Sequence, residues 1–218
     1  MSEYSAIIFD LDGTLLDTLE DIADSMNTVL NRFGYRAQSI DSYRYYVGDG
    51  LENLIKRVTG NINIGKSEIK DIKRNFKKEY EKRWNLKTKP YHNILDLLNS
   101  LQNKGIKMAV LSNKPDGFAR IMASYYFPEI RFECVIGEKR GYPIKPDPFF
   151  AVKISKDLNI PPKHFVYLGD TKTDMETALN AKMLPVGALW GFRTEEELLS
   201  SGAKFLVSDP LEVLKFFY

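Results

Sequence analysis

The chain has 218 residues, of which 44% are hydrophobic and 28% charged, a composition typical of a globular protein that buries a substantial core. Its net charge of +2 gives no reason to expect a nucleic acid partner, and its single cysteine, Cys134, excludes an intramolecular disulfide and a cysteine-based zinc cluster. No run of about eighteen apolar residues occurs, and the start lacks the basic and apolar segments of a targeting signal, so we expect a cytoplasmic protein that binds no membrane.

The first predicted element is a buried strand, the apolar run at residues 6–8, which leads into two aspartates and a glycine. Such a run before a turn signal is typical of a strand whose carboxyl end opens into a loop, the place where ligands bind in open α/β sheets. Asp10 and Asp12 are two positions apart, so on an extended chain both point towards one site. Two carboxylates held close together need a cation or a proton. The alternative is a plain turn in which Asp12 and Gly13 only reverse the chain.

Helical periodicity fills the next part of the chain. Apolar residues recur there at three- and four-residue steps, and no strand-like alternation interrupts them. Thr18 and Asp21 resemble a capping box at the start of the first of these helices. We therefore predict an all-helical cap domain at residues 16–87, inserted into an α/β core that consists of residues 1–15 and 88–218.

From residue 90 onward, helical and strand patterns alternate. The predicted strands cover residues 106–111, 132–136, 165–168, 184–190 and 204–207, and the predicted helices cover residues 94–101, 118–127, 148–158 and 174–182, with two more that begin near residues 195 and 210. We expect Thr194, with Glu197, and Asp209 to cap the last two helices. Repeated βα units predict an α/β fold with a doubly wound, mostly parallel sheet and helices on both faces.

Polar residues of a particular kind follow three of the later strands. Ser112 and Asn113 offer donors for an anionic oxygen, although turns and caps are the commoner use of such residues. Lys145 stands between two prolines, either to hold an ammonium near a polyanion or as a surface lysine in a stiff loop. Asp170 follows its strand directly, and Asp174 lies in the next helix's first turn, where the helix dipole favours a carboxylate. Acids gathered at one edge of the sheet favour a hard cation with oxygen ligands, and magnesium suits them best.

Taken together, these segments resemble the haloacid dehalogenase superfamily, and specifically its phosphatase branch with a helical cap inserted after the first motif. Four superfamily motifs occur in order and span essentially the whole chain: Asp10-Leu11-Asp12-Gly13-Thr14, Ser112, Lys145 and Gly169-Asp170-Thr171-Lys172-Thr173-Asp174. Each motif is weak alone, but the four together are highly specific. The resemblance implies a Rossmann-like core.

The resemblance extends to the phosphoglycolate phosphatases. It rests on residues 47–51, 105–107, 112–115, 145–148 and 190–191. It implies that Gly48, Asp49 and Gly50 in the cap contact the organic part of the substrate. Two positions depart from the family pattern: Lys182 replaces a glycine after the last motif's helix, and Glu-Lys-Arg at residues 138–140 replaces a Gly-Asp-rich approach to the third motif.

The resemblance also implies a role for each acid. Asp10 is the expected nucleophile, which forms an aspartyl phosphate and divides hydrolysis into two displacements. Asp12 is the expected general acid and base, which protonates the leaving oxygen and later takes a proton from water. The implied cofactor is Mg²⁺, held by Asp10, the backbone carbonyl of Asp12, and Asp170, with Asp174 as a supporting or water-mediated ligand.

The implied partner is a small-molecule phosphate ester, whose phosphoryl oxygens Ser112, Asn113 and Lys145 would hold. Nothing in the pattern decides between a monomer and a homodimer.

Other readings of the same residues stay open. A pyrophosphatase or a sugar phosphomutase of the same branch shares these motifs, and a catalytically idle phosphate-binding regulatory protein is the alternative from another class. Arg44, Lys56 and Arg57 are cap residues able to pair with a substrate carboxylate, although solvated helix positions are their commoner role.

Overall fold

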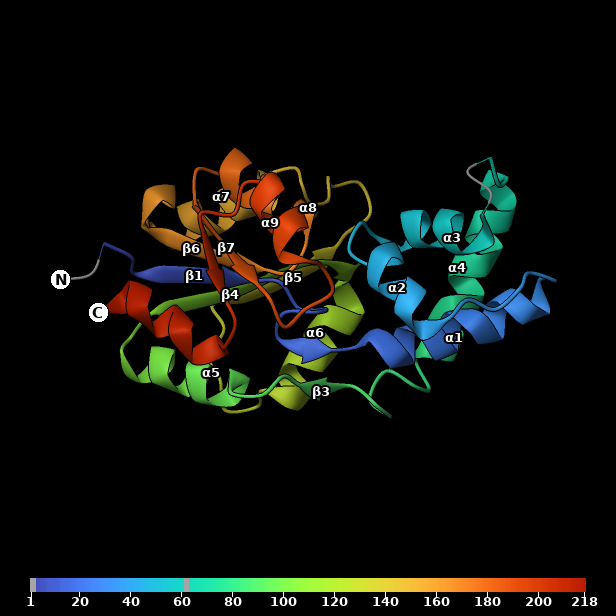
Figure 1. The fold of residues 1–218 in the computed structure, drawn as a ribbon, viewed down its shortest axis with the longest axis horizontal. Coiled ribbons are helices and arrows are strands. Elements are labelled where there is room, and N and C mark those ends of the chain that lie inside the picture. The colour runs from blue at the N-terminus through green and yellow to red at the C-terminus, as the bar shows by residue number, and fades with distance from the viewer. Residues whose placement is uncertain (1–2, 61–62) are drawn as a thin grey trace.

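Six strands form one sheet at the centre of the molecule, in the order β5-β4-β1-β6-β7-β8 (Figure 1). The computed structural model describes residues 3–60 and 63–218. The strands of this sheet are β1 (Ala6–Phe9), β4 (Lys107–Pro115), β5 (Cys134–Glu138), β6 (Phe165–Gly169), β7 (Leu184–Ala188) and β8 (Phe205–Val207). Each neighbouring pair is parallel, so the predicted α/β class with a mostly parallel sheet is confirmed.

Helices cover both faces of this sheet. They are α5 (Ile94–Asn103), α6 (Asp116–Tyr126), α7 (Phe149–Asp157), α8 (Lys172–Asn180), α9 (Glu195–Ser200) and the 3₁₀ helices η1 (Pro162–His164) and η2 (Pro210–Phe217). Because successive strand residues point to opposite faces, Ile7 and Phe9 pack with α5, α6 and η2, whereas Ala6 and Ile8 pack with α7 and α8. Figure 1 shows these two helical layers on either side of the strands.

Strand β4 is longer than the sequence pattern predicts, because it continues past Leu111 through Ser112 and Asn113 to Pro115. Its pairing with β5 shifts register between Leu111 and Pro115, and Pro115 pairs with Glu138. The polar residues that we expected after the strand therefore belong to its last, irregular part. Extended backbone with a bulge in this position aims several consecutive polar side chains at the end of the sheet.

Four further helices lie together at the end of the molecule that is farthest from both chain ends, and we call them the cap (Figure 1). They are α1 (Leu19–Arg32), α2 (Ile40–Tyr46), α3 (Leu51–Thr59) and α4 (Lys66–Tyr80). The cap has its own hydrophobic cluster, which includes Met26, Ile55 and Ile72. Phe118 of α6 and Phe192 also belong to that cluster, so the cap packs directly on the part of the chain that carries the sheet.

The chain passes between sheet and cap through two short segments that pair with each other. Strand β2 (Leu16–Asp17) is antiparallel to β3 (Lys89–Pro90). The predicted domain boundaries at residues 15/16 and 87/88 lie beside this ladder and stay a prediction. The carboxyl ends of β1, β4 and β6 point towards the cap, so the residues that follow them lie between sheet and cap (Figure 1).

The start of α1 corrects one local expectation. Thr18 makes no side-chain capping bond, and its buried hydroxyl has no hydrogen-bond partner. Asp21 instead accepts hydrogen bonds from Lys87 N at 3.0 Å and from the amide and hydroxyl of Thr88 at 2.8 and 2.7 Å. The carboxylate therefore ties the outgoing segment of the chain to the returning one. By contrast, Thr194 and Asp209 cap α9 and η2 as expected.

Among the residues that the structure describes, we find no helix whose length and apolar character would let it cross a membrane.

Candidate active site

The site lies where β1, β4 and β6 end side by side. Phe9, the last residue of β1, pairs with Val110 of β4 and Leu168 of β6. Asp10 follows directly and donates its backbone N–H to Leu168 O at 3.0 Å, which fixes it at the carboxyl edge of the sheet. Because parallel strands place their carboxyl ends at one edge, Asp170 arrives beside it.

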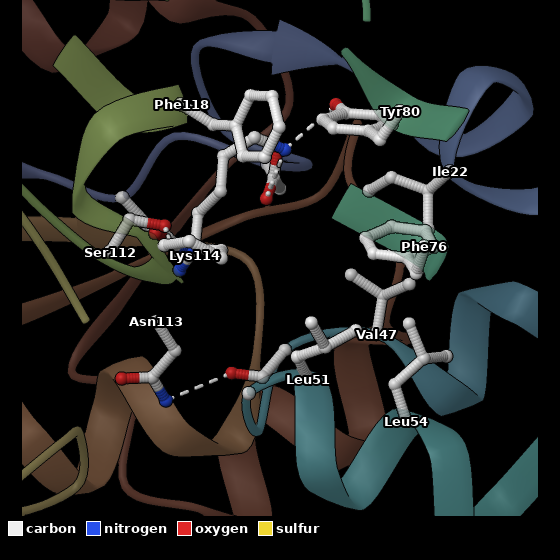
Figure 2. A pocket seen from close by; sticks show the side chains of 15 residues that line it. Ile22, Val47, Leu51, Leu54, Phe76, Tyr80, Ser112, Asn113, Lys114 and Phe118 are labelled. Carbon is white, nitrogen blue, oxygen red and sulfur yellow. Dashed lines mark hydrogen bonds and ion pairs between the residues drawn. The ribbon is translucent and has the colours of Figure 1, made fainter. Parts of the chain in front are cut away.

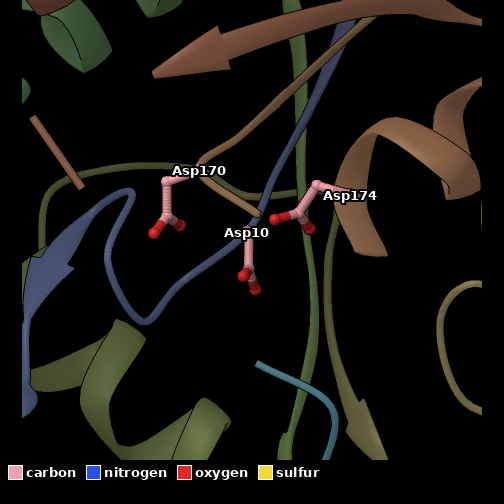
Figure 3. A group of neighbouring side chains, drawn as sticks. All are labelled: Asp10, Asp170 and Asp174. Carbon is pink, nitrogen blue, oxygen red and sulfur yellow. The ribbon is translucent and has the colours of Figure 1, made fainter. Parts of the chain in front are cut away.

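Three carboxylates meet at this edge. Asp10, Asp170 and Asp174 each offer an oxygen, and these oxygens lie within 4.8 Å of one another (Figure 3). All three side chains are buried. Burial and then the charges of the neighbouring carboxylates raise the pKa of Asp170 well above its usual range. Burial also raises the pKa of Asp10 to about 7, against the opposing charge of Lys145. The group is thus short of positive charge, and a divalent cation would supply it.

Lys145 brings the one ammonium that touches these acids among the residues described. Its Nζ lies 2.9 Å from Asp10 Oδ1 and donates a hydrogen bond to Asp174 Oδ1 at 2.6 Å. Burial alone would lower the pKa of this lysine, but the charges of Asp10 and Asp174 outweigh it and hold the pKa well above its usual range. The contact of Lys145 with Asp10 is an ion pair whose angles do not meet those of a hydrogen bond. Asp10 Oδ1 is therefore buried without a hydrogen-bond partner.

The remaining contacts of the acids fix their orientation. Asp170 accepts hydrogen bonds from the Thr14 hydroxyl and from Phe192 N, both at 2.8 Å. Asp174 forms a capping box with Thr171 at the start of α8, so its Oδ2 serves the helix while its Oδ1 faces Lys145. Its place in the first helical turn was predicted from the sequence. Its second partner makes it more than a helix cap.

Asp12 has a different partner from Asp10. Its two carboxylate oxygens lie 2.9 and 3.2 Å from Lys114 Nζ, in an ion pair that is buried on both sides. Asp12 lies in the turn that follows β1, in which the Leu15 and Leu16 amides bond to Leu11 O, and it is not one of the three clustered acids. Asp10 and Asp12 nevertheless line one cavity.

That cavity, of about 50 Å³, lies between the cap and the ends of the strands (Figure 2). Its polar wall comes from the strand ends and its apolar wall mostly from the cap. The apolar side chains are Ile22, Val47, Leu51, Leu54, Phe76, Tyr80 and Phe118. Gly48 and Gly50, two of the predicted specificity residues, also line it.

Asp49, the third predicted specificity residue, lies away from this cavity. It accepts hydrogen bonds from Thr173 and Arg57, and with both it lines a second hollow between cap and core. Burial raises the pKa of Asp49, but these two bonds outweigh it and the net shift is downward. Its observed contacts join the cap to α8.

Ser112 and Asn113 both line the main cavity, but their side chains are engaged differently. Ser112 Oγ accepts a hydrogen bond from Lys114 N at 3.3 Å. Asn113 donates both amide hydrogens to backbone carbonyls, to Gly48 O and to Lys145 O, each at 3.0 Å, and accepts from Lys145 N at 2.9 Å. Asn113 therefore holds the loop of Lys145 and the cap loop together, and its predicted contact with phosphate stays a prediction.

Sequence reasoning missed four residues that the structure brings to the site. Lys114 and Thr14 lie next to predicted site residues in the sequence. Both are polar and lie near the end of a strand, and this could have identified them as site residues. Tyr80 and Arg193 gave no such signal. Tyr80 Oη accepts from Lys114 Nζ at 2.8 Å, and Arg193, which is 9% exposed, donates to Val47 O at 2.9 Å. Both contacts cross from core to cap.

Comparison with known proteins agrees with this geometry. Residues 7–188 match the family model for haloacid dehalogenase-like hydrolases. The chain is 31% identical to a phosphoglycolate phosphatase of Psychrobacter arcticus, over 88% of this chain and 86% of that one. It is 30% identical to a phosphoglycolate phosphatase of Aquifex aeolicus, over 96% of this chain and 94% of that one.

Solved structures give the same result for the fold. The crystal structure of a predicted phosphoglycolate phosphatase from Haemophilus somnus superimposes with a TM-score of 0.92, at 25% identity and over the whole length of both chains. The matched residues include the acids at the ends of β1 and β6 and the cap between them. The resemblance drawn from the four motifs is therefore confirmed, and the chain belongs to the haloacid dehalogenase-like hydrolases.

Proposed function

We propose that this chain is a magnesium-dependent phosphomonoester hydrolase that works through an aspartyl phosphate and acts on a small phosphorylated metabolite, with phosphoglycolate as the first candidate. The observation that carries the proposal is the buried group of Asp10, Asp170 and Asp174 beside Lys145, with Asp12 lining the same cavity as Asp10. The relatives named phosphoglycolate phosphatase support the choice of substrate.

The residues at the site fit magnesium. The candidate ligand atoms are all oxygens, as a hard cation requires. The buried Asp10 Oδ1 accepts no hydrogen bond, so it is free to bind a cation. Asp10, Asp170 and the backbone carbonyl of Asp12 would hold the ion. Asp174 would support them, because its Oδ1 already accepts a hydrogen bond from Lys145. When bound, the ion would offset the repulsion between the nucleophile and the phosphate and polarise the phosphoryl oxygens.

Two displacements at phosphorus describe the reaction. In the first, a carboxylate oxygen of Asp10 bonds to phosphorus while the bond from phosphorus to the leaving oxygen breaks, and Asp12 gives that oxygen its proton. In the second, Asp12 takes a proton from a water that attacks phosphorus. The bond between phosphorus and Asp10 then breaks, which frees inorganic phosphate and restores the carboxylate.

The other residues hold the phosphoryl group in place. Lys145 Nζ, already 2.9 Å from Asp10, supplies positive charge next to the oxygens that become more negative in the transition state. The Ser112 hydroxyl and backbone N–H groups at the same edge can donate to these oxygens. The cap would limit the access of bulk water, because its apolar side chains line much of the cavity that Asp10 and Asp12 also line.

The test is phosphate release from a panel of esters that includes phosphoglycolate, pyrophosphate and sugar phosphates, with Mg²⁺ and with EDTA. We expect Mg²⁺-dependent hydrolysis that Asp10→Asn abolishes while circular dichroism stays unchanged. Unchanged turnover in Asp10→Asn would sink the covalent route, and an isomerised sugar phosphate in place of free phosphate would identify a mutase. A chain inert towards the whole panel would revive the idle binding protein.

A further inference from the structure

Lys114 is the only cationic side chain among the fifteen described residues that line the main cavity (Figure 2). It lies near the end of β4, and its side chain is 3% exposed. Its Nζ donates to both oxygens of Asp12, at 2.9 and 3.2 Å, and to Tyr80 Oη at 2.8 Å. The ammonium is thus held between the acid of the core and a phenol of the cap.

The three cap cations that the sequence offered as partners for a substrate carboxylate are engaged elsewhere. Arg44 donates to Gly191 O at 3.3 Å, and Lys56 pairs with Glu52 at 3.0 Å on the surface of α3. Arg57 bonds to Asp49 and to two carbonyls of α2. None of the three lines the main cavity. Among the described residues, Lys114 is the one cation that lines it, and Lys145, beside Asp10, is taken up by the phosphoryl group, so an anionic part of the leaving group is left with Lys114.

We propose that Lys114 binds a carboxylate on the leaving group of the substrate, and that this contact makes the site select small phosphate esters of hydroxy acids. The inference rests on the proposed function, because it takes Asp12 as the group that protonates the leaving oxygen. It adds the residue that reads the organic part of the substrate and places that residue in the core, where the sequence had indicated the cap loop at residues 47–51.

Reach supports this assignment. A leaving oxygen bonded to Asp12 lies about 2.7 Å from the carboxyl, and Lys114 Nζ lies 2.9 Å from the same carboxyl. A carboxylate one carbon beyond the leaving oxygen can therefore reach the ammonium when both partners lie on the cavity side of Asp12. The cavity is narrow, and the side chains of Phe76 and Phe118 lie along its wall, which favours a small leaving group.

The apolar lining of the cavity explains why one ammonium can select esters that carry a carboxylate. The side chains around Lys114 are largely apolar, with Leu51, Phe76 and Phe118 among them. A carboxylate enclosed by such side chains loses its water and must be paired, whereas a neutral group of the same size needs no partner. Tyr80 orients the ammonium from the cap, so this binding site is complete only when the cap is closed.

The experiment compares phosphoglycolate with ethyl phosphate, in which a methyl group replaces the carboxylate. We expect the wild-type protein to prefer phosphoglycolate by kcat/KM. In Lys114→Met, that preference should fall about 100-fold, mainly through the KM for phosphoglycolate, because a buried charge pair has lost one partner. Lys114→Arg keeps the charge and should recover part of the preference. Lys107→Met, on the same strand and paired with Glu133 at 2.8 Å on the surface, is the matched control.

Each outcome bears on a separate claim. If Lys114→Met slows both esters by the same factor, Lys114 acts only through Asp12 and the inference is wrong. If the wild-type protein hydrolyses both esters equally well, the inference also fails, although the proposed phosphatase function stands. If the wild-type protein hydrolyses neither ester nor any other in the panel, the proposed function itself has failed. Should Lys114→Met not fold, Lys114→Gln and the wild-type preference carry the same decision.

Discussion

Lys145 Nζ lies 2.6 Å from Asp174 Oδ1, although 29 positions separate the two residues in the chain. Both side chains are almost completely buried, and the same ammonium lies 2.9 Å from Asp10. One lysine thus balances part of the charge of the three neighbouring carboxylates. Without a metal ion, the stability of the site depends on this lysine.

Replacing Lys145 tests that dependence. Lys145→Met should lower the free energy of unfolding of the metal-free protein by about 3 kcal/mol, because the buried acids lose their partner. Urea denaturation in EDTA measures the loss. Lys153→Met is the control, since Lys153 pairs with Asp157 on the surface, where an ion pair contributes less than about 1 kcal/mol. Equal losses in the two variants would contradict the prediction.

The raised pKa of Asp10 predicts a pH dependence with a definite sign. A carboxyl whose pKa rises from 3.8 in the unfolded chain to about 7 in the fold stabilises the fold fully below the lower value. That contribution is lost as the pH rises through the upper one. The melting temperature of the metal-free protein should therefore fall as the pH rises towards about 7.

Magnesium should reverse this loss. Because the ion requires Asp10 and Asp170 as carboxylates, it displaces protons and binds more tightly as the pH rises. Thermal unfolding with and without Mg²⁺ at several pH values measures both effects. A stabilisation by Mg²⁺ that is the same at acidic and at alkaline pH contradicts the prediction, and Asp10→Asn should flatten the dependence.

Gly13 faces Asp170 so closely that an added methyl group would overlap the carboxylate, and its φ of +86° is in the left-handed region. Gly13→Ala should displace Asp170, weaken Mg²⁺ binding and lower kcat about 100-fold, the usual effect of a small misplacement at a reacting centre. Gly34→Ala is the matched control. Gly34 has a similar φ of +77° but no atom within 4 Å of the added carbon, so only stability should change, by about 1 kcal/mol. Normal activity in Gly13→Ala would count against the metal site.

Arg193 joins core and cap through the carbonyl of Val47. Arg193→Met leaves that buried carbonyl without its donor, which should cost about 1–3 kcal/mol in closing the cap. Amide hydrogen exchange at residues 45–50 should accelerate, and kcat/KM should fall with it. Arg120→Met, whose arginine pairs with Asp116 on the surface of α6, should alter neither quantity. Unchanged exchange in Arg193→Met would show that other contacts close the cap.

The succession of strands and helices along the chain, and the gathering of the acids at one edge of the sheet, were predictable because both follow from local patterns. Apolar runs mark the strands, and parallel strands bring the residues after them to one edge. Asp10, Lys145, Asp170 and Asp174 could thus be grouped from the sequence. The structure places oxygens of the three acids within 4.8 Å of one another, and Lys145 contacts two of them.

The contact of Lys114 with Tyr80 was not predictable in that way. It depends on where the cap rests on the core, and no local pattern contains that relation. Thr18 illustrates the same limit at a smaller scale. A capping box of Thr18 with Asp21 is sound local chemistry, but Asp21 bonds to Lys87 and Thr88, which belong to the segment that returns from the cap to the core.

Two residues of the core hold the cap loop by hydrogen bonds to its backbone: Arg193 donates to the carbonyl of Val47, and Asn113 donates to the carbonyl of Gly48. Carbonyl oxygens are common to all amino acids, so this attachment does not depend on which side chains the loop carries. The side chain of Val47, which lines the cavity, can therefore be exchanged to suit a new ester without removing this attachment, whereas Gly48 and Gly50, with φ of +121° and +83°, must stay glycine. The range of substrates and the closure of the cap can therefore be engineered separately.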